Sequence, residues 1–254
     1  MVHELDRALS KATGRHCAAL LLSTLSGLVT KGGAESIFDQ GTITFVKVGE
    51  DVYGVTNEHV ANPQGAPSDH IFHVALDQHF PLPRPPLFMS TPSNPDCPYD
   101  LAIFKMDLEA IVNAGKMPID LTEAPSIQLE AENLALVVGF PGYRRQITKE
   151  HTVHEMAHVV STCRLLSDRT IMLVDVLNDL PPDLRFGGLS GGPIFALGAE
   201  QEYQFVGIVF DGRGPGDFEE EVNQAGSPIN KEEIWVRGFP LTRDTLKGIL
   251  GKSA

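Results

Sequence analysis

The sequence predicts an all-β protein with short helices near its two ends. The chain has 254 residues, and its 24 glycines and 18 prolines lie in short, scattered groups that favour many turns. Between the turns lie apolar or alternating runs, most of about four to eight residues, rich in valine, isoleucine and phenylalanine. Hydrophobic residues make up 42% of the chain, which is enough to fill a sizeable core. Numerous short strands are therefore favoured over a few long helices.

The runs that predict strands recur along most of the chain. They include CAALLLS (17–23), GTITFVKVG (41–49), DVYGVTNEHV (51–60), DLAIFKM (100–106), NLALVVGFPG (133–142), RTIMLVDVL (169–177), YQFVGIVFDG (203–212) and EIWVRGFPL (233–241). The proline-rich segment 80–98 cannot supply donors at the centre of a sheet, so we expect it to be a surface loop. Near the C-terminus, Thr242 as N-cap and the apolar Leu246 and Ile249 predict a short helix.

The acidic composition excludes two classes of partner. The formal net charge is −13 and the pI is about 5.0. Such a chain has no basic stripe for phosphate backbones and would be repelled by an anionic membrane surface. We therefore expect neither nucleic-acid nor membrane binding.

The cysteines indicate the compartment. Cys17, Cys97 and Cys163 are too few and too widely spaced for a disulfide framework or a cysteine-rich zinc site. A reducing, cytoplasmic compartment is the simplest interpretation. Export is the alternative, because the apolar run at 17–29 follows two basic residues and residues 1–30 could act as a signal peptide. Acidic residues near the start argue against that alternative.

The stretch VHEMAHVV (153–160) fits the zinc-peptidase pattern H-E-x-x-H. On a helix, His154 and His158 would share one face and could bind one Zn²⁺, while Glu155 polarised a bound water. The pattern lacks a third ligand, because no histidine follows His158 and the next glutamate is Glu200. We expect no metal and no cofactor, and a zinc metallopeptidase remains the less favoured alternative. As a strand, the same stretch would place both histidines on one sheet face.

The segment FGGLSGGPIF (186–195) surrounds Ser190 with glycines, which permit a tight and otherwise strained backbone. A serine held in this way can expose its hydroxyl while its own N–H and that of Gly188 point into one small concavity. Such a concavity is an oxyanion hole. The segment therefore predicts a nucleophilic serine, with a glycine-rich hairpin turn as the structural alternative.

A nucleophilic serine needs a base and an orienting acid, and both residue types occur upstream. His59 follows the strand-like run in GVTNEHVAN (54–62), where its ring can project from a strand end or a first helical turn. Asp100 directly precedes the apolar run of DLAIFKM. With Ser190, these residues are candidates for a catalytic triad in the chain order His, Asp, Ser.

Three blocks together resemble the chymotrypsin/trypsin-like serine peptidases. VTNEHV (55–60) is similar to that family's V-T-A-A-H, DLAIFKM (100–106) to its D-h-A-L-h block, where h is apolar, and GLSGGPIF (188–195) to G-x-S-G-G-P. Singly, only the last block is specific, but the order and spacing of all three agree. The resemblance covers about residues 36–240.

The resemblance implies a double six-stranded antiparallel β-barrel of chymotrypsin type, with its site in the cleft between the barrels. The first lobe would span residues 36–125 and the second 126–240. Residues 1–35 would form an N-terminal helix and first strand, and residues 241–254 a C-terminal helix, all within one peptidase domain.

The resemblance also implies a mechanism. His59 would take the proton of Ser190, Asp100 would hold the imidazolium, and the amides of Gly188 and Ser190 would bind the oxyanion. The implied function is a serine endopeptidase that cleaves protein or peptide substrates through an acyl-enzyme. The alternative from another class is a catalytically silent, protease-like binding module. A regulatory protein partner that restrains the enzyme is a further hypothesis.

The chain departs from the family pattern at several positions. Asn57 and Glu58 replace the usual small pair before the histidine, which changes the local packing. Leu189 occupies the place where zymogen-type members carry an aspartate that pairs with a new N-terminus. We therefore expect no activation by that ion pair. The family's disulfides are also absent, as in its intracellular and bacterial members.

By analogy, the floor of the substrate pocket lies about six residues before the nucleophile, at Leu184, with walls near Phe210 and Gly212. These residues favour a small or apolar P1 side chain. A one-residue shift would place Asp183 at the floor and favour lysine or arginine, and Asp211 could have the same effect.

Overall fold

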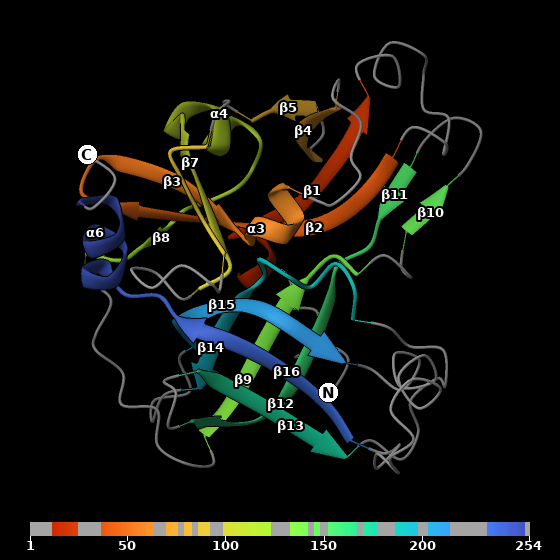
Figure 1. The fold of residues 1–254 in the computed structure, drawn as a ribbon, viewed down its shortest axis with the longest axis vertical. Coiled ribbons are helices and arrows are strands. Elements are labelled where there is room, and N and C mark those ends of the chain that lie inside the picture. The colour runs from red at the N-terminus through yellow and green to blue at the C-terminus, as the bar shows by residue number, and fades with distance from the viewer. Residues whose placement is uncertain are drawn as a thin grey trace.

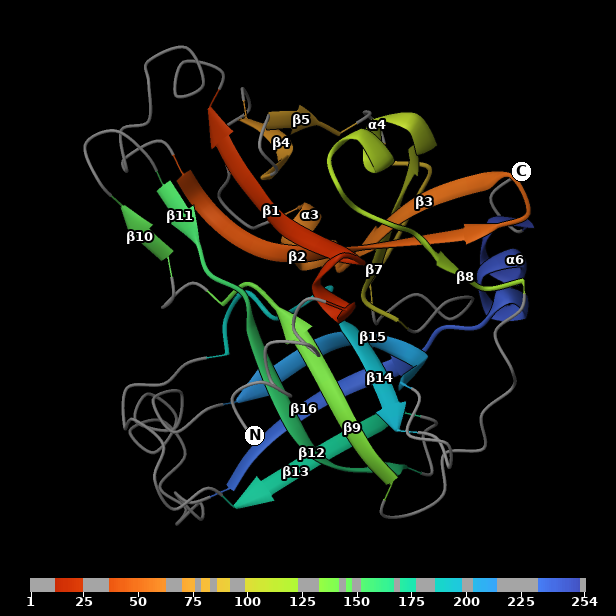
Figure 2. The same cartoon turned by 180° about the vertical axis from the view of Figure 1, so that it is seen from behind.

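The computed structural model describes residues 12–24, 37–62, 70–75, 79–82, 86–91, 99–122, 133–141, 145–147, 152–166, 170–176, 186–197, 203–213 and 233–251. These residues form two β-rich lobes, one above the other in Figures 1 and 2. The predicted all-β class is confirmed, because nearly all the elements are strands and the helices are short.

The first lobe is an eight-stranded sheet whose main path runs in the order β5-β4-β1-β2-β3-β7-β6. The strands are β1 (Cys17–Thr24), β2 (Ile37–Val48), β3 (Asp51–Thr56), β4 (His70–Ala75), β5 (His79–Pro81), β6 (Phe88–Ser90), β7 (Leu101–Met106) and β8 (Ile119–Asp120), which pairs with β2. Two helices belong to this lobe, α3 (Glu58–Ala61) and α4 (Leu108–Asn113). One helical turn at residues 12–14 precedes β1.

The second lobe is a closed six-stranded barrel in the order β12-β13-β16-β15-β14-β9. Its strands are β9 (Asn133–Gly139), β12 (Ala157–Leu165), β13 (Ile171–Val176), β14 (Pro193–Leu197), β15 (Tyr203–Arg213) and β16 (Glu233–Pro240). A separate hairpin of β10 (Arg145–Ile147) and β11 (Thr152–His154) connects β9 to β12. Closure removes exposed strand edges from this lobe.

The proline-rich segment 80–98, which the sequence predicts to be a surface loop, is partly strand. Phe88–Ser90 form β6, which pairs with β7, and Pro81 ends β5. Both strands are terminal in the sheet order, and a sheet edge is where a strand tolerates a proline such as Pro81.

The HEMAH stretch is not a helix. His154 ends β11, Glu155 and Met156 lie outside any strand, and Ala157 begins β12, which pairs with β9. The helical arrangement that would put His154 and His158 on one face is therefore not formed. Among the described residues, no group of three His, Cys, Asp or Glu side chains could hold a metal ion.

The C-terminal helix α6 (Arg243–Gly251) forms where the sequence predicts it and joins the two lobes. The Thr242 hydroxyl accepts a hydrogen bond from the Thr245 amide at 3.1 Å, which is an N-cap. Leu246 and Ile249 are buried in one core cluster with residues of both sheets. This cluster fixes the helix of the second lobe against the first lobe (Figure 1). In the described part of the chain, no helix is long and apolar enough to cross a membrane.

Candidate functional site

His59 lies on a one-turn helix at the end of β3. Asn57 is the N-cap of α3, with extended backbone angles of φ −88° and ψ 153° that end the strand. Val60 and Ala61 are buried and anchor the turn against the first-lobe core. The His59 side chain is 50% exposed, so its ring faces the space beside the sheet.

Asp100 lies next to His59 because β3 and β7 pair. The antiparallel register puts Thr56 opposite Ala102, so the residue before β7 lies beside the start of α3. The Asp100 carboxylate is only 12% exposed and is hydrogen-bonded to the His59 ring through Oδ2 and Nδ1. The His59 backbone amide also donates to Asp100 Oδ1 at 3.1 Å. Two contacts to one carboxylate fix the orientation of the imidazole and leave Nε2 on its far side.

Asn57 holds the other side of Asp100. Its side chain is fully buried, and its Nδ2 donates to the backbone carbonyl of Asp100 at 2.8 Å. Its Oδ1 is buried and has no hydrogen-bond partner among the described residues. Asn57 therefore adds a direct link between the two strand ends that carry His59 and Asp100.

The turn around Ser190 uses the glycine freedom that the sequence suggests. Gly188 and Gly191 have positive φ angles of 99° and 86°, which side chains rarely adopt. A Cβ on Gly191 would lie 1.9 Å from the carbonyl oxygen of Thr42 and 2.5 Å from Oγ1 of Thr56. Only glycine allows the loop to approach the first lobe so closely.

Buried threonines join the loop to the first lobe. Thr42 donates from its hydroxyl to Gly188 O and from its amide to Ser190 O, at 2.7 and 2.9 Å. Thr44 donates to Gly191 O at 2.7 Å. Because Thr56 in turn bonds to Thr42 O and lies three residues before His59, the serine loop and the histidine lie at the same lobe boundary. Sequence reasoning missed these threonines. The signal that could have found them is a pair of hydroxyl side chains, Thr42 and Thr44, on one face of the strand-like run GTITF.

The amides of the loop divide into two groups. The amide of Leu189 donates to Phe186 O, that of Gly191 to Val209 O and that of Gly192 to Leu189 O. The amides of Gly188 and Ser190 donate to no acceptor among the described residues. Gly188 and the serine itself therefore each have an N–H with no acceptor in the described structure, and two such donors are what an oxyanion hole needs. Ser190 itself is partly exposed and has no hydrogen bond to His59 within the described ranges.

The expected pocket residues divide between described and undescribed parts of the chain. Leu184 and Asp183 lie outside the described residues. Phe210 and Gly212 lie on β15, and a Cβ on Gly212 would contact Phe186 at 3.4 Å. The Phe210 ring stacks with Phe239, with centroids 6.4 Å apart. These contacts put β15 beside the segment that leads into the serine loop.

The comparisons with known proteins support the fold only. No protein-family model and no curated protein sequence matches the chain. A solved structure that is similar is a thermostable serine protease, AL20, from an extremophilic microorganism. The match has a TM-score of 0.52 and 11% sequence identity, and it covers 96% of this chain and 98% of that one. The chain therefore has a serine-protease-like fold over nearly its whole length.

Proposed function

We propose that this protein is a serine endopeptidase that hydrolyses peptide bonds in protein or peptide substrates. The observation that carries the proposal is the site at the lobe boundary. There, a histidine bonded twice to a largely buried aspartate lies near a serine loop with two amides that have no acceptor among the described residues. Each group has the residue type and neighbours that one step of acyl transfer requires.

In the proposed mechanism, Ser190 Oγ attacks the scissile carbonyl and His59 Nε2 takes its proton. The imidazolium is stabilised by Asp100, which also keeps the Nδ1 proton in place. The carbonyl oxygen becomes an oxyanion and is bound by the Gly188 and Ser190 amides. His59 then protonates the leaving amine, and water hydrolyses the acyl-enzyme by the same route.

Leu189 supports the proposal that the site needs no proteolytic activation. Its side chain is 1% exposed and packs in the barrel core, where a Cβ on Gly139 would lie 2.9 Å from Leu189 Cδ2. Apolar burial is present as soon as the barrel folds, whereas an ion pair with a new N-terminus requires cleavage. The serine loop therefore forms together with the barrel.

Fluorophosphonate labelling tests the proposed nucleophile. The probe should label the wild-type protein and the Ser161→Ala control, which changes a buried serine on β12, but not Ser190→Ala. Labelling that survives Ser190→Ala, or activity abolished by a chelator, would contradict the serine mechanism. A protein that folds but is never labelled and cuts no substrate would instead be the protease-like binding module.

Substrate preference is the less defined part of the proposal. The Phe210 and Gly212 wall favours a small or apolar P1 residue, whereas Asp211 on the same strand would favour lysine or arginine. Mass-spectrometric profiling of cleavage sites in a peptide library separates the two. Cleavage mainly after lysine or arginine would overturn the apolar preference.

A further inference from the structure

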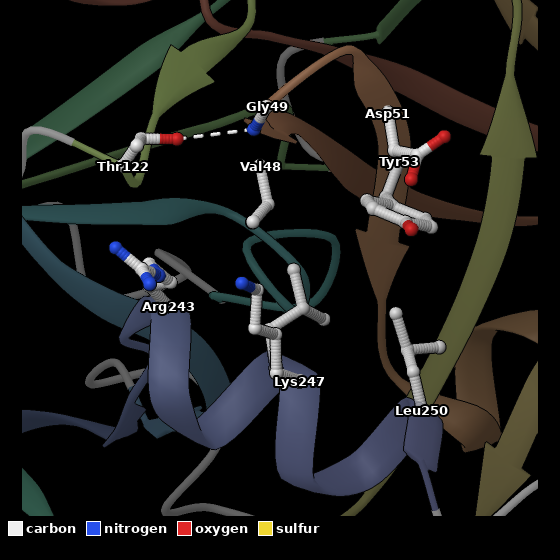
Figure 3. Close-up of a pocket in the computed structure, with 9 residues that line it drawn as sticks. Val48, Gly49, Asp51, Tyr53, Thr122, Arg243, Lys247 and Leu250 are labelled. Atoms are coloured by element: carbon white, nitrogen blue, oxygen red, sulfur yellow. Dashed lines mark hydrogen bonds between the residues drawn. The ribbon is translucent and has the colours of Figure 1, made fainter.

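A cavity of about 400 Å³ lies between α6 and the turn that joins β2 to β3, outside the site described above (Figure 3). Leu246 and Leu250 of α6 and Val48 at the end of β2 supply its apolar surface. A volume of this size is within the range of pockets that hold small ligands. The turn leaves space there, because a Cβ on Gly49 would have no atom within 4 Å.

Two cationic side chains extend from α6 into this cavity. Arg243 and Lys247 lie one helical turn apart, and Figure 3 shows both on the side of α6 that faces Val48 and Thr122. Neither has a carboxylate or hydrogen-bond partner among the described residues. By contrast, the nearby Lys47 and Lys105 pair with Asp120 and Asp51.

The acidic composition of the chain makes two cations without a partner in the described structure unusual. The chain carries a net charge of −13, so acidic side chains are abundant, yet none of those in the described ranges pairs with Arg243 or Lys247. Asp51 also lines the cavity, but its carboxylate is hydrogen-bonded to Lys105 on β7. The positive charge on the α6 wall is therefore not balanced from the opposite wall.

We propose that this cavity binds a carboxylate attached to an apolar group, such as the free C-terminus of a peptide that ends in an apolar residue. The carboxylate would lie between the Arg243 guanidinium and the Lys247 ammonium, which suit it in charge and hydrogen bonding. The apolar group would contact Leu250 and Val48, which are partly exposed. Because α6 leaves the barrel and packs on the first lobe, a ligand here would hold the two lobes together.

Titration of the ¹⁵N-labelled full chain with N-acetyl-leucine, followed by NMR, tests the proposal. We expect saturable shifts at the amides of Gly49, Thr122 and α6, and no comparable shifts with N-acetyl-leucine amide, which lacks the charge. Inorganic phosphate, which has the charge but no apolar group, should bind more weakly. Equal binding of the neutral amide or of phosphate would overturn the proposal.

Variants separate the site from general charge effects. Arg243→Gln and Lys247→Gln should each weaken N-acetyl-leucine binding about tenfold, the usual effect of losing one charged hydrogen bond. Arg15→Gln removes one cation from another surface and should leave binding unchanged. Equal loss in Arg15→Gln would contradict the assignment. Because fluorophosphonate labelling at Ser190 reports on the other site, failure of either proposal is distinguishable from failure of the other.

Discussion

Replacing Asn57 by alanine should slow the reaction of Ser190 with little change in stability. The substitution removes the 2.8 Å bond from Nδ2 to Asp100 O, which costs about 1 kcal/mol. It also removes the buried Oδ1 that has no partner in the described structure, and this removal stabilises the folded state by about 1 to 3 kcal/mol. The two effects oppose each other, so we expect the free energy of unfolding to change by less than about 2 kcal/mol.

The effect on reactivity is not offset in the same way. Without the Asn57 side chain, the bond to the Asp100 carbonyl is lost, and the aspartate is held beside His59 only by the β3–β7 pairing and its own contacts with His59 among the described residues, so it can move more freely. Displacements of about 1 Å in catalytic groups cost up to about a hundredfold in rate. We expect the second-order rate constant of fluorophosphonate labelling to fall roughly tenfold to a hundredfold.

The matched control is Asn62→Ala, at the other end of α3. Asn62 also donates from Nδ2, at 2.9 Å, but to the exposed Glu58 side chain and not to Asp100. Labelling rates and thermal unfolding of both variants are measured together. An unchanged labelling rate in Asn57→Ala, or an equal loss in Asn62→Ala, would refute the positioning argument.

Three further outcomes follow from the structure. Gly191→Ala should destabilise the protein by at least about 3 kcal/mol, because of the positive φ and the clash with Thr42 O. Gly248→Ala, at an exposed position of α6, should stabilise the protein by about 0.5–1 kcal/mol, and urea unfolding compares the two variants. Burial lowers the pKa of His16, so the stability linked to it is present above pH about 6.5 and is lost as pH falls through the lowered pKa. The loss between pH 7.5 and 5.5 should be smaller in His16→Asn, and equal losses would contradict this reasoning. Burial raises the pKa of Cys17 to about 12, so its thiol should react with a disulfide reagent only after unfolding, as mass spectrometry of the labelled peptide can show.

The local part of the fold was predictable from the sequence. Turn residues and apolar runs indicate where strands begin and end. Thr242 as N-cap, with the apolar Leu246 and Ile249 after it, predicts α6. The HEMAH stretch shows the limit of local patterns, because it fits a helix and a strand alike. Pairing of Ala157 and His158 with β9 decides the structure, and that pairing depends on residues about twenty positions away.

The sequence predicts the residue types of the candidate site, but it does not predict the strand register and hydrogen bonds that hold those residues in place. His59 and Asp100 are brought together by the β3–β7 register, which follows from neither run alone. Thr42 and Thr44 read as ordinary β-branched strand residues, because threonine favours strands in any case. Their bonds to the serine loop connect positions about 146 residues apart, and only the assembled lobes define them.

The threonine contacts also explain how a site divided between two lobes can be kept in register. A hinge between lobes would separate His59 from Ser190 if only side-chain packing joined them. Here the backbone of β2 bonds directly to Ser190 O, and Thr42 Oγ1 both donates to Gly188 O and accepts from the Phe140 amide. One buried hydroxyl therefore links the first lobe to the serine loop and to the end of β9. Because a broken buried hydrogen bond leaves unsatisfied groups on both sides, lobe separation at this point is costly. The position of the serine loop relative to His59 is thus set by β2, before any substrate binds.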